Sequence, residues 1–349
     1  PSLLAPETPV WRETNTMPGS AGSSWYAIRY CDALNPGRFV GPEAEAYWMA
    51  GGVDLYVGGS EHAVGHLLYS RFWQNVLFDL GEVTTPEPFR RLFHQGLITS
   101  FAYQRKDKTL VPVDQVSEPS EGAFVETATG APVSQIVAKM SKSLKNVVNP
   151  DDVIAEFGAD TFRLYEMYMG PLEASKPWNP RDIAGLFRFL QRLWRLAVDE
   201  ETGKPRASDE PSAHIEKLLH RLVVKVGADI DRLSLNTAIA AAIEFVNACV
   251  GVDKGKGALT SDQVRRLALT LCPFVPHIAE ELWARHGGAG FASHQPWPQV
   301  DARLLVDDEL EVPVQVAGKV RSRVMVPAGA DVGTHERVAL ADARVQEFI

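Results

Sequence analysis

A short apolar stretch that runs into two glycines and a long helical pattern most constrains the fold of this chain. Val53-Asp54-Leu55-Tyr56-Val57 has the composition of a strand and leads directly into Gly58-Gly59. From Glu61 to Leu80 apolar residues recur at helical spacing, and Gly81 ends the pattern. Strand, glycine turn and helix form the unit of a parallel α/β sheet, in which ligands lie at the carboxyl ends of the strands.

The pattern of apolar and polar residues changes twice along the rest of the chain, from strand-like to helical and back to strand-like. Residues 97–99 predict the start of a strand. Residues 100–138 alternate extended pieces with turns at 117–122 and 130, which is typical of a β-rich segment. After Pro150 the pattern is helical, with Asp151-Asp152 and Asp160 as expected helix caps. Near the end, two alternating strands precede a helix that begins near Thr334. Helices are expected at 153–157, 160–169, 181–198, 214–233, 236–250, 262–271 and 276–286, and the late strands at 310–316 and 319–326.

Composition bounds the class of protein. The chain has 349 residues and a net charge of −9, which argues against bulk non-specific binding to nucleic acid. No apolar run approaches the ~18 residues of a membrane span, and no secretory signal is recognisable, so we expect no membrane partner. Cys31, Cys249 and Cys272 are odd in number and far apart, which favours a reducing, cytoplasmic location over a disulfide framework.

One loop carries a dense cluster of cations and hydroxyls. Lys139-Met140-Ser141-Lys142-Ser143 follows the extended stretch Gln135–Ala138 and precedes Asn146 and a turn at Asn149-Pro150. Each lysine is a compact, flexible charge with three donors, which suits a mobile clamp on a polyphosphate. The alternative for such a pattern taken alone is a solvated basic loop.

Two histidines and a hydroxyl pair are further candidates. His62 and His66 are four residues apart and share a helix face, which is compatible with a metal pair, structural histidines or contact with a substrate. No cysteine or glutamate pattern supplies a third metal ligand, so we expect no metal site. Ser23 and Tyr26 are three apart on an expected helix, where they either offer hydroxyls to one pocket or simply accompany a packed face.

Two groups of basic residues are candidates for contact with RNA. Arg188, Arg192 and Arg195 fall on one face of the long helix, and a solvated basic face is the alternative. Lys319, Arg321 and Arg323 alternate along the last strand, which predicts one wholly cationic face. An exposed strand face without a ligand is the alternative there.

The order and wording of several blocks resemble bacterial leucyl-tRNA synthetase, a class I aminoacyl-tRNA synthetase. Besides the lysine loop these blocks are Trp11-Arg12-Glu13-Thr14-Asn15-Thr16-Met17, Ser23-Ser24-Trp25-Tyr26, Gly58-Gly59-Ser60-Glu61-His62-Ala63, and Asn149-Pro150-Asp151-Asp152-Val153 through Gly158-Ala159-Asp160-Thr161. The resemblance implies the Rossmann-like second half of a catalytic domain (1–150), an all-α tRNA-binding bundle (151–300) and a truncated α+β C-terminal module (301–349).

The resemblance also implies the roles of the candidate residues. It implies ATP with Mg²⁺ as cofactor, Lys139 and Lys142 as catalytic residues, and ATP contacts from Gly59, Glu61, Gln95, Gly96 and the loop residues Lys139, Met140, Ser141, Lys142 and Ser143. It implies leucine contacts from Ser23, Tyr26, His62 and His66, and tRNA contacts from Arg188, Arg192, Arg195, Lys319, Arg321 and Arg323. Ser20 departs from the family, which usually has a bulky aromatic residue there.

The family pattern is not covered in full. Neither the first nucleotide-binding half, with its His-Ile-Gly-His-type motif, nor the editing domain is recognisable in this sequence. We therefore expect a leucine–tRNA ligase fragment or split subunit that is inactive alone, with tRNA(Leu), leucine, ATP and a separate N-terminal subunit as partners. The alternatives are a synthetase for another aliphatic or sulfur-containing amino acid and a non-catalytic tRNA-binding or partner subunit.

Overall fold

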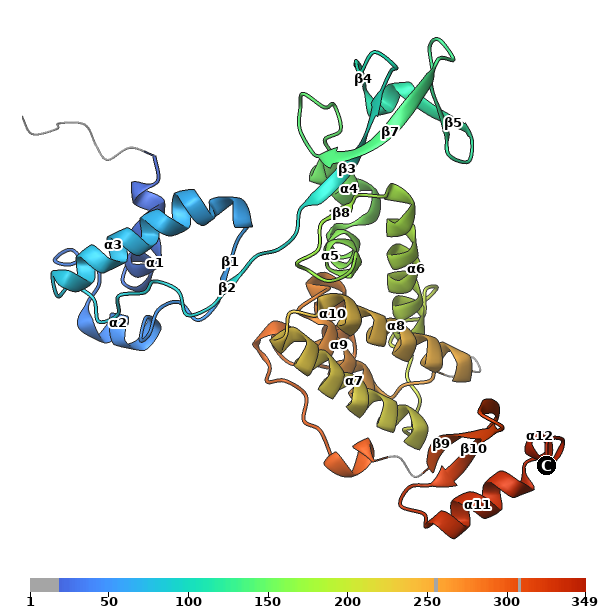
Figure 1. Ribbon diagram of the computed structural model, residues 1–349. Coiled ribbons are helices and arrows are strands. Elements are labelled where there is room, and N and C mark those ends of the chain that lie inside the picture. Colours follow the sequence, from blue (N-terminus) through green and yellow to red (C-terminus); the bar gives the residue numbers. More distant parts are fainter. Residues whose placement is uncertain (1–18, 254–256, 307–308) are drawn as a thin grey trace, which may run out of the picture. The chain divides into compact units, whose positions relative to one another are not determined.

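The computed structural model describes residues 19–253, 257–306 and 309–349, which form two compact units (Figure 1). The first unit extends to Val148 and includes Pro171–Trp178; the second comprises Asn149–Gly170 and Asn179–Ile349. The first boundary lies close to the predicted one at residue 150, but the segment Pro171–Trp178 returns to the first unit. The Trp11–Met17 block lies outside the described residues, and a separate module at 301–349 stays a prediction.

The first unit contains the expected strand–glycine–helix arrangement. Strand β1 (Tyr56–Val57) pairs in parallel with β2 (Leu92–Phe93), with Tyr56 opposite Leu92. Between them the chain forms a 3₁₀ turn (Ser60–His62), a π-helical turn (Ala63–Leu67) and helix α3 (Leu68–Asp79). The strand is shorter than predicted, and the predicted helix 61–80 is divided into three segments. Gly81 ends it with a positive φ of 73°, a conformation that favours glycine.

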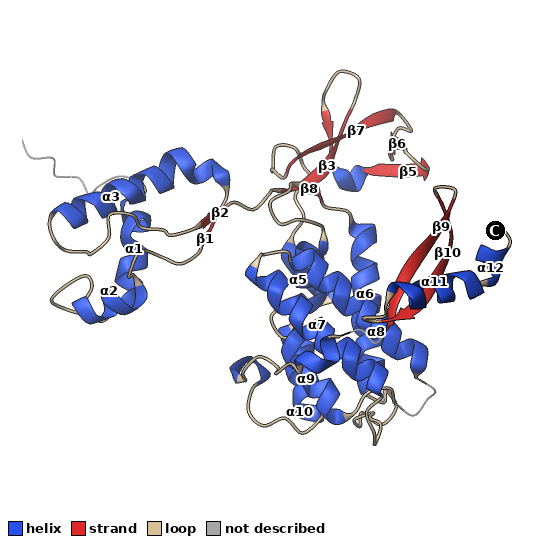
Figure 2. Ribbon diagram, turned by 60° about the horizontal axis from the view of Figure 1, so that its bottom comes forward, coloured by secondary structure: helices blue, strands red, loops and turns tan. Residues whose placement is uncertain are grey.

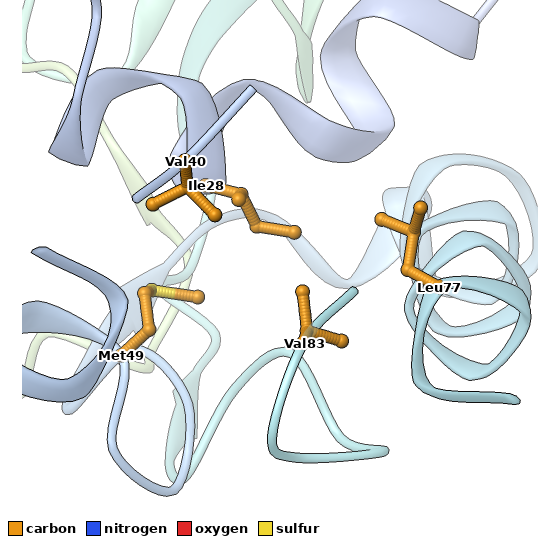
Figure 3. Close-up of a cluster of buried hydrophobic side chains, with 5 residues drawn as sticks. All are labelled: Ile28, Val40, Met49, Leu77 and Val83. Atoms are coloured by element: carbon orange, nitrogen blue, oxygen red, sulfur yellow. The ribbon is translucent and has the colours of Figure 1, made fainter. Parts of the chain in front are cut away.

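Helices α1 (Ala21–Cys31) and α2 (Pro42–Trp48) pack with α3 around a small apolar core. Figure 3 shows the side chains that converge there, which are Ile28, Val40, Met49, Leu77 and Val83. Their burial removes apolar surface from water and fixes α1, which carries Ser23 and Tyr26, against α3, which directly follows the turns that carry His62 and His66.

The predicted β-rich segment at 100–138 is confirmed, and it forms part of a mostly antiparallel sheet. Its strands follow the order β4-β3-β7-β6-β5, and β8 (Lys176–Pro177) adds in parallel to β3. The predicted turn at 117–122 is wrong in extent, because β5 continues to Ser120 and only Glu121–Gly122 turn. The other bounds are β3 Ile98–Gln104, β4 Leu110–Val111, β5 Val116–Ser120, β6 Ala123–Glu126 and β7 Pro132–Lys139, with a 3₁₀ turn at Val113–Gln115.

The second unit contains the expected helical bundle (Figure 2). Helix α6 shows why these segments are helical, because its buried residues recur every three or four positions, from Ile183 to Leu196. The bounds are α4 Pro150–Phe157, α5 Ala159–Tyr168, α6 Pro180–Ala197, α7 Ala213–Asp231, α8 Leu235–Val252, α9 Ser261–Leu271 and α10 Pro276–Arg285.

Helix α8 is an exception to the expectation that no segment has the length and apolarity of a membrane span. By length and composition alone it is able to cross a membrane. In the bundle it packs against α5, α6 and α7, and it buries Ile239, Phe245, Val246 and Cys249. Helix α8 is therefore one of the packed helices of the bundle.

Both predicted helix caps differ from the structure. Asn149, rather than Asp151 or Asp152, caps α4, and its Oδ1 accepts a hydrogen bond from the Asp151 backbone N–H. Asp160 lies inside α5 and is buried, and its carboxylate accepts hydrogen bonds at the first turn of α10 instead. Aspartate is a residue type that favours helix caps, but Asp160 bonds the backbone of α10, a helix that is distant in sequence.

The C-terminal elements form an antiparallel hairpin followed by two helices. Strands β9 (Glu309–Val316) and β10 (Lys319–Pro327) pair along their length, with a register shift between Val320 and Ser322. Helices α11 (Val332–Ala341) and α12 (Ala343–Gln346) pack against β10. Two 3₁₀ turns, Ala292–His294 and Ala302–Leu305, lie in the segment that connects α10 to β9.

Candidate functional site

The first unit contains a pocket of about 500 Å³ beside the β1–β2 pair. Residues far apart in the sequence meet here, because α1, the β1 end with its glycine turn, and the loop after β2 all contribute to the lining. Of the predicted site residues it brings together Ser23, Tyr26, Gly59, Glu61, His62, His66 and Gln95, together with the divergent Ser20. The pocket thus lies at the carboxyl end of the strand, as the parallel βαβ unit predicts.

A chain of hydrogen bonds crosses the pocket wall. The hydroxyls of Tyr26 and Tyr56 are 3.0 Å apart, and the Tyr56 hydroxyl is 2.7 Å from Nε2 of His66. The Tyr56 ring stacks on Phe89, with ring centroids 4.0 Å apart. Each group therefore restrains the orientation of the next, and helix α1 is linked to the π-helical turn that carries His66.

Burial sets the charge state of this wall. It lowers the pKa of His66, and the neighbouring His62 lowers it further. Burial also raises the pKa of Tyr56, with a smaller contribution from its hydrogen bond to Tyr26. At neutral pH both groups are therefore uncharged. The Nδ1 atom of His66 is buried without a hydrogen-bond partner among the described residues, so one polar atom in the wall is unsatisfied.

Backbone and carboxylate groups line the glycine turn. The carbonyl oxygen of Gly58 is 2.7 Å from Nδ1 of His94, a second lining residue. A Cβ atom on Gly59 would lie 2.1 Å from the Glu61 carboxylate, so this position accepts a side chain only if Glu61 moves. The absence of side chains at both glycines keeps the backbone accessible to a ligand.

Gly96, unlike Gln95, does not line the pocket. Its N–H donates to the carbonyl of Leu172 at 2.9 Å, and a Cβ atom there would lie 2.2 Å from the carbonyl carbon of Ala174. The glycine is therefore required for close packing of the loop against the segment 171–175.

The lysine loop follows β7 directly and is held by a buried amide. Asn146 is 2 % exposed; its Oδ1 accepts from the Ser141 N–H at 3.0 Å, and its Nδ2 donates to the Lys139 carbonyl at 3.4 Å. The hydroxyls of Ser141 and Ser143 are 3.1 Å apart. Lys139 and Lys142 are exposed and form no ion pair with any described residue, and the loop does not line the pocket.

The two basic groups differ in how freely their charges face solvent. On α6, Arg188 and Arg195 are exposed opposite the buried face, but Arg195 pairs with Glu200 at 3.0 Å. Arg192 is partly buried, and its Nε has no hydrogen-bond partner among the described residues.

On β10 the predicted alternation holds from Arg321 onward, because Ser322 and Val324 are buried and Arg323 is exposed, but the cations differ in their contacts. The register shift places Arg321 in a bulge, where its guanidinium lies 4.1 Å from the centroid of the Phe348 ring. Arg323 pairs with Glu311 at 2.7 Å. Of the three predicted residues, only Lys319 is exposed without such a partner in the described part of the chain.

Sequence reasoning missed several residues of the pocket. Tyr56, Leu67, Leu92 and His94 were not predicted, although all line it. Tyr56 was detectable in principle, because it lies two residues before Gly58 at the carboxyl end of the predicted strand. His94 gave no local signal, since its place in the pocket depends on the pairing of β2 with β1. Among the described residues no cluster of three His, Cys, Asp or Glu side chains has the geometry to hold a metal ion.

Comparisons with known proteins identify the family. Residues 213–338 match the model of the anticodon-binding domain of tRNA ligase, and residues 130–176 match class I tRNA synthetases of the I, L, M and V group. Leucine–tRNA ligases of Mycobacterium leprae and Nocardia farcinica are 48 % and 49 % identical over 98 % and 97 % of this chain. The chain spans 36 % and 37 % of their lengths, respectively.

A solved structure agrees with the sequence relatives. LeuRS of Agrobacterium radiobacter K84, in a ternary complex with tRNA and LeuAMS, has a TM-score of 0.69 and 28 % identity, covering 93 % of this chain and 39 % of that one. Over nearly its whole length the chain is therefore homologous to the leucine–tRNA ligases, and two of its segments match models of tRNA ligases and class I tRNA synthetases.

Proposed function

We propose that this chain supplies the C-terminal part of a leucine–tRNA ligase, which activates leucine with ATP and transfers it to tRNA(Leu). The observation that carries the proposal is the pocket, in which the residues implied for leucine and for ATP meet beside the β1–β2 pair. The agreement with leucine–tRNA ligases over nearly the whole chain supports the choice of amino acid. We also propose a cytoplasmic location, in keeping with three free cysteines.

The pocket has groups suited to an aminoacyl adenylate. Ser23, Tyr26, His62 and His66 provide uncharged and titratable donors or acceptors for the amino acid end. Glu61, Gln95 and the backbone at Gly59 lie along the same lining and suit the ribose and adenine end. In the homologous LeuRS complex the bound compound is LeuAMS, which supports an adenylate as the ligand here.

Activation requires neutralisation of charge on the phosphates. A leucine carboxylate attacks the α-phosphate of ATP, the new acyl–phosphate bond forms and pyrophosphate leaves. Lys142, assisted by Lys139, would bind the pyrophosphate where charge develops, since both are exposed and without an ion pair in the described residues. Mg²⁺ that arrives with ATP would supply further neutralisation of the phosphate charge.

Contact with tRNA(Leu) is proposed for the second unit. The anticodon-binding match over residues 213–338 supports this, as does the tRNA in the homologous complex. The proposed contacts are Arg188, Arg192, Arg195, Lys319, Arg321 and Arg323, and phosphates are the expected partners of cationic side chains. Since the chain spans 36 % of its relatives' length, we propose that a further N-terminal polypeptide completes the nucleotide site.

The experiment that tests the pocket is the binding of LeuAMS, by titration calorimetry, to the full chain combined with the N-terminal part of the Mycobacterium leprae relative, which would complete the nucleotide site. Wild type should bind, and His62→Ala should weaken binding about tenfold through loss of a polar contact. Leu34→Ala, at an exposed position outside the pocket, is the control. Equal affinity of His62→Ala and wild type would remove His62 from the site. Preference for the methionyl or valyl analogue would favour a synthetase for another amino acid, and absence of all binding would favour a non-catalytic tRNA-binding subunit.

A further inference from the structure

A third lysine, just beyond the five-residue lysine motif, has a backbone conformation that lysine rarely adopts. Lys145 has a φ of 52°, in the left-handed region where a Cβ atom is crowded and glycine or asparagine is the usual residue. Lys108, Leu233 and Ala317 are also non-glycine residues with a positive φ, so the conformation alone assigns no role. A role for Lys145 therefore depends on its neighbours in the loop.

Lys145 closes a turn that begins at Lys142. Its backbone N–H donates to the Lys142 carbonyl at 3.2 Å, and the Leu144 N–H donates to the Ser141 hydroxyl at 3.2 Å. In a four-residue turn of this kind the first and last Cα atoms lie within about 7 Å of each other. The side chains of Lys142 and Lys145 therefore start from neighbouring points of the backbone.

The buried side chain of Asn146 holds this turn from the next position. It is 2 % exposed and bonds the backbone of Ser141 and of Lys139, at the start of the loop. A change of Lys145 to an ordinary backbone conformation would move Asn146 away from these partners. The left-handed conformation of Lys145 is thus part of the structure that orders the lysine motif.

The loop gathers three ammonium groups without a carboxylate partner. Lys139, Lys142 and Lys145 are exposed, and none of them forms an ion pair with another described residue. Like charges that start from points this close repel each other, and the left-handed backbone of Lys145 adds a conformational cost. An anionic ligand with charge on several oxygens, such as a polyphosphate, offsets both costs.

We propose that Lys145 is a third phosphate-binding residue of the lysine loop, which holds the β- and γ-phosphates of ATP together with Lys142. This inference rests on the proposed function and deepens it by naming a further residue for the pyrophosphate that leaves. A flexible ammonium with three donors suits this role, because negative charge on these phosphates increases as the bond to the α-phosphate breaks.

The test measures the binding of ATP and of AMP, each with Mg²⁺, to the full chain combined with the N-terminal part of the Mycobacterium leprae relative. Lys145→Gly removes the ammonium and suits the left-handed backbone. It should weaken ATP binding about tenfold, as for the loss of one hydrogen bond to a charged group. AMP lacks the β- and γ-phosphates, so its affinity should be unchanged. Lys145→Arg keeps the cation and should bind ATP more tightly than Lys145→Gly.

Lys108→Gly is the matched control. Lys108 is an exposed lysine with a φ of 66°, and it lies in the turn that follows β3, whereas Lys139 pairs with Thr99 near the start of β3. Lys108→Gly therefore changes the net charge and the backbone as Lys145→Gly does, but away from the lysine loop. Its ATP affinity should equal that of wild type.

Four results would overturn the inference. They are equal ATP affinity of Lys145→Gly and wild type, an equal loss of affinity for ATP and AMP, an equal loss in Lys108→Gly, and absence of ATP binding by the wild-type complex. Pyrophosphate exchange separates the inference from the proposed function. If wild type binds ATP through Lys145 but shows no leucine-dependent exchange, the proposed function fails while the phosphate contact stands. If exchange occurs and Lys145→Gly binds ATP as wild type does, the inference fails and the proposed function stands.

Discussion

The hydroxyl of Tyr56 lies 2.7 Å from Nε2 of His66, and the same phenol ring stacks on Phe89. The orientation of His66 therefore depends on a strand residue that is fixed by its own ring contact. Because burial lowers the pKa of His66, its imidazole is neutral near pH 7, and the hydrogen bond with Tyr56 constrains which ring nitrogen carries the proton.

Replacement of Tyr56 by phenylalanine should remove the hydrogen bond and keep the ring stacking. We expect the affinity for LeuAMS to fall about tenfold, the effect of one net hydrogen bond of about 1 kcal/mol with the loss of orientation. The melting temperature should change little. Tyr47→Phe, at a residue 78 % exposed, is the matched control. Unchanged LeuAMS affinity in Tyr56→Phe would show that His66 does not depend on this bond.

Asn146 lies outside the five-residue lysine motif, and we expect it to position the lysine loop for adenylate formation. Its buried amide joins the Ser141 N–H to the Lys139 carbonyl, so Asn146→Ala leaves both groups without this partner and loosens the loop. We expect slower adenylate formation in the enzyme completed with the N-terminal polypeptide, and no change in LeuAMS binding. Val147→Ala, at an exposed neighbour, is the control. A rate equal to wild type would contradict the assignment of Asn146 as the residue that positions the loop.

How far the sequence predicts this structure depends on whether each signal is local. Helix α6 was predicted closely, because its periodicity lies within the segment itself, whereas the predicted extended stretch 135–138 covers only half of strand β7. Asp160 shows the limit, since it was expected to cap its own helix and instead bonds the backbone N–H of Ile278 at 2.8 Å, in a helix 118 residues away. The bulge at Arg321 in β10 was not predictable for a related reason, because pairing with β9 sets it.

For the candidate site, too, residues with a local sequence signal were predicted and residues placed by contacts between distant segments were not. Histidines, glycines and hydroxyls at recognisable positions were found in one pocket, because a motif preserves both residue type and place in the fold. His94 and Leu92 were missed, since they enter the pocket only through the parallel pairing of β2 with β1. The family resemblance implies an ATP contact from Gly96, yet its backbone packs closely against the segment around Ala174.

Glu216 should make the stability of the second unit sensitive to acid. Burial by itself raises its pKa, but hydrogen bonds from Arg266 and Gln263 outweigh this and lower it to about 2. A carboxyl with a lowered pKa in the folded state stabilises fully above its unfolded pKa of about 4.5. Its contribution, on the order of 2–3 kcal/mol, is lost as the pH falls from about 4.5 to 2.

Chemical denaturation between pH 2 and 6 measures this contribution. Glu216→Gln should be less stable than wild type at pH 6, and the difference should shrink toward pH 2. Glu210→Gln, at an exposed glutamate, is the control and should follow the wild-type curve. A constant difference between Glu216→Gln and wild type across the range would contradict the role assigned to the Glu216 charge.

The cations of β10 should contribute less to tRNA binding than three free charges would. Arg323 is paired with Glu311 and Arg321 stacks on Phe348, so Lys319 is the main free charge. Alanine at all three positions should reduce the slope of log affinity against log salt by about one unit, whereas three phosphate contacts would give about three. The measurement is tRNA(Leu) affinity across a salt series. An unchanged slope would leave this face solvated and shift the contact to Arg188 and its neighbours on α6.

Leucine-dependent exchange of pyrophosphate into ATP, measured with the full chain and the N-terminal polypeptide together, tests the proposed leucine–tRNA ligase activity. We expect exchange with leucine in preference to isoleucine, valine and methionine, and none with this chain alone. We also expect a rate about 10²–10³-fold lower for Lys142→Ala, as for loss of one contact that stabilises the transition state. Exchange that prefers another amino acid, or a Lys142→Ala rate equal to wild type, would contradict this proposal.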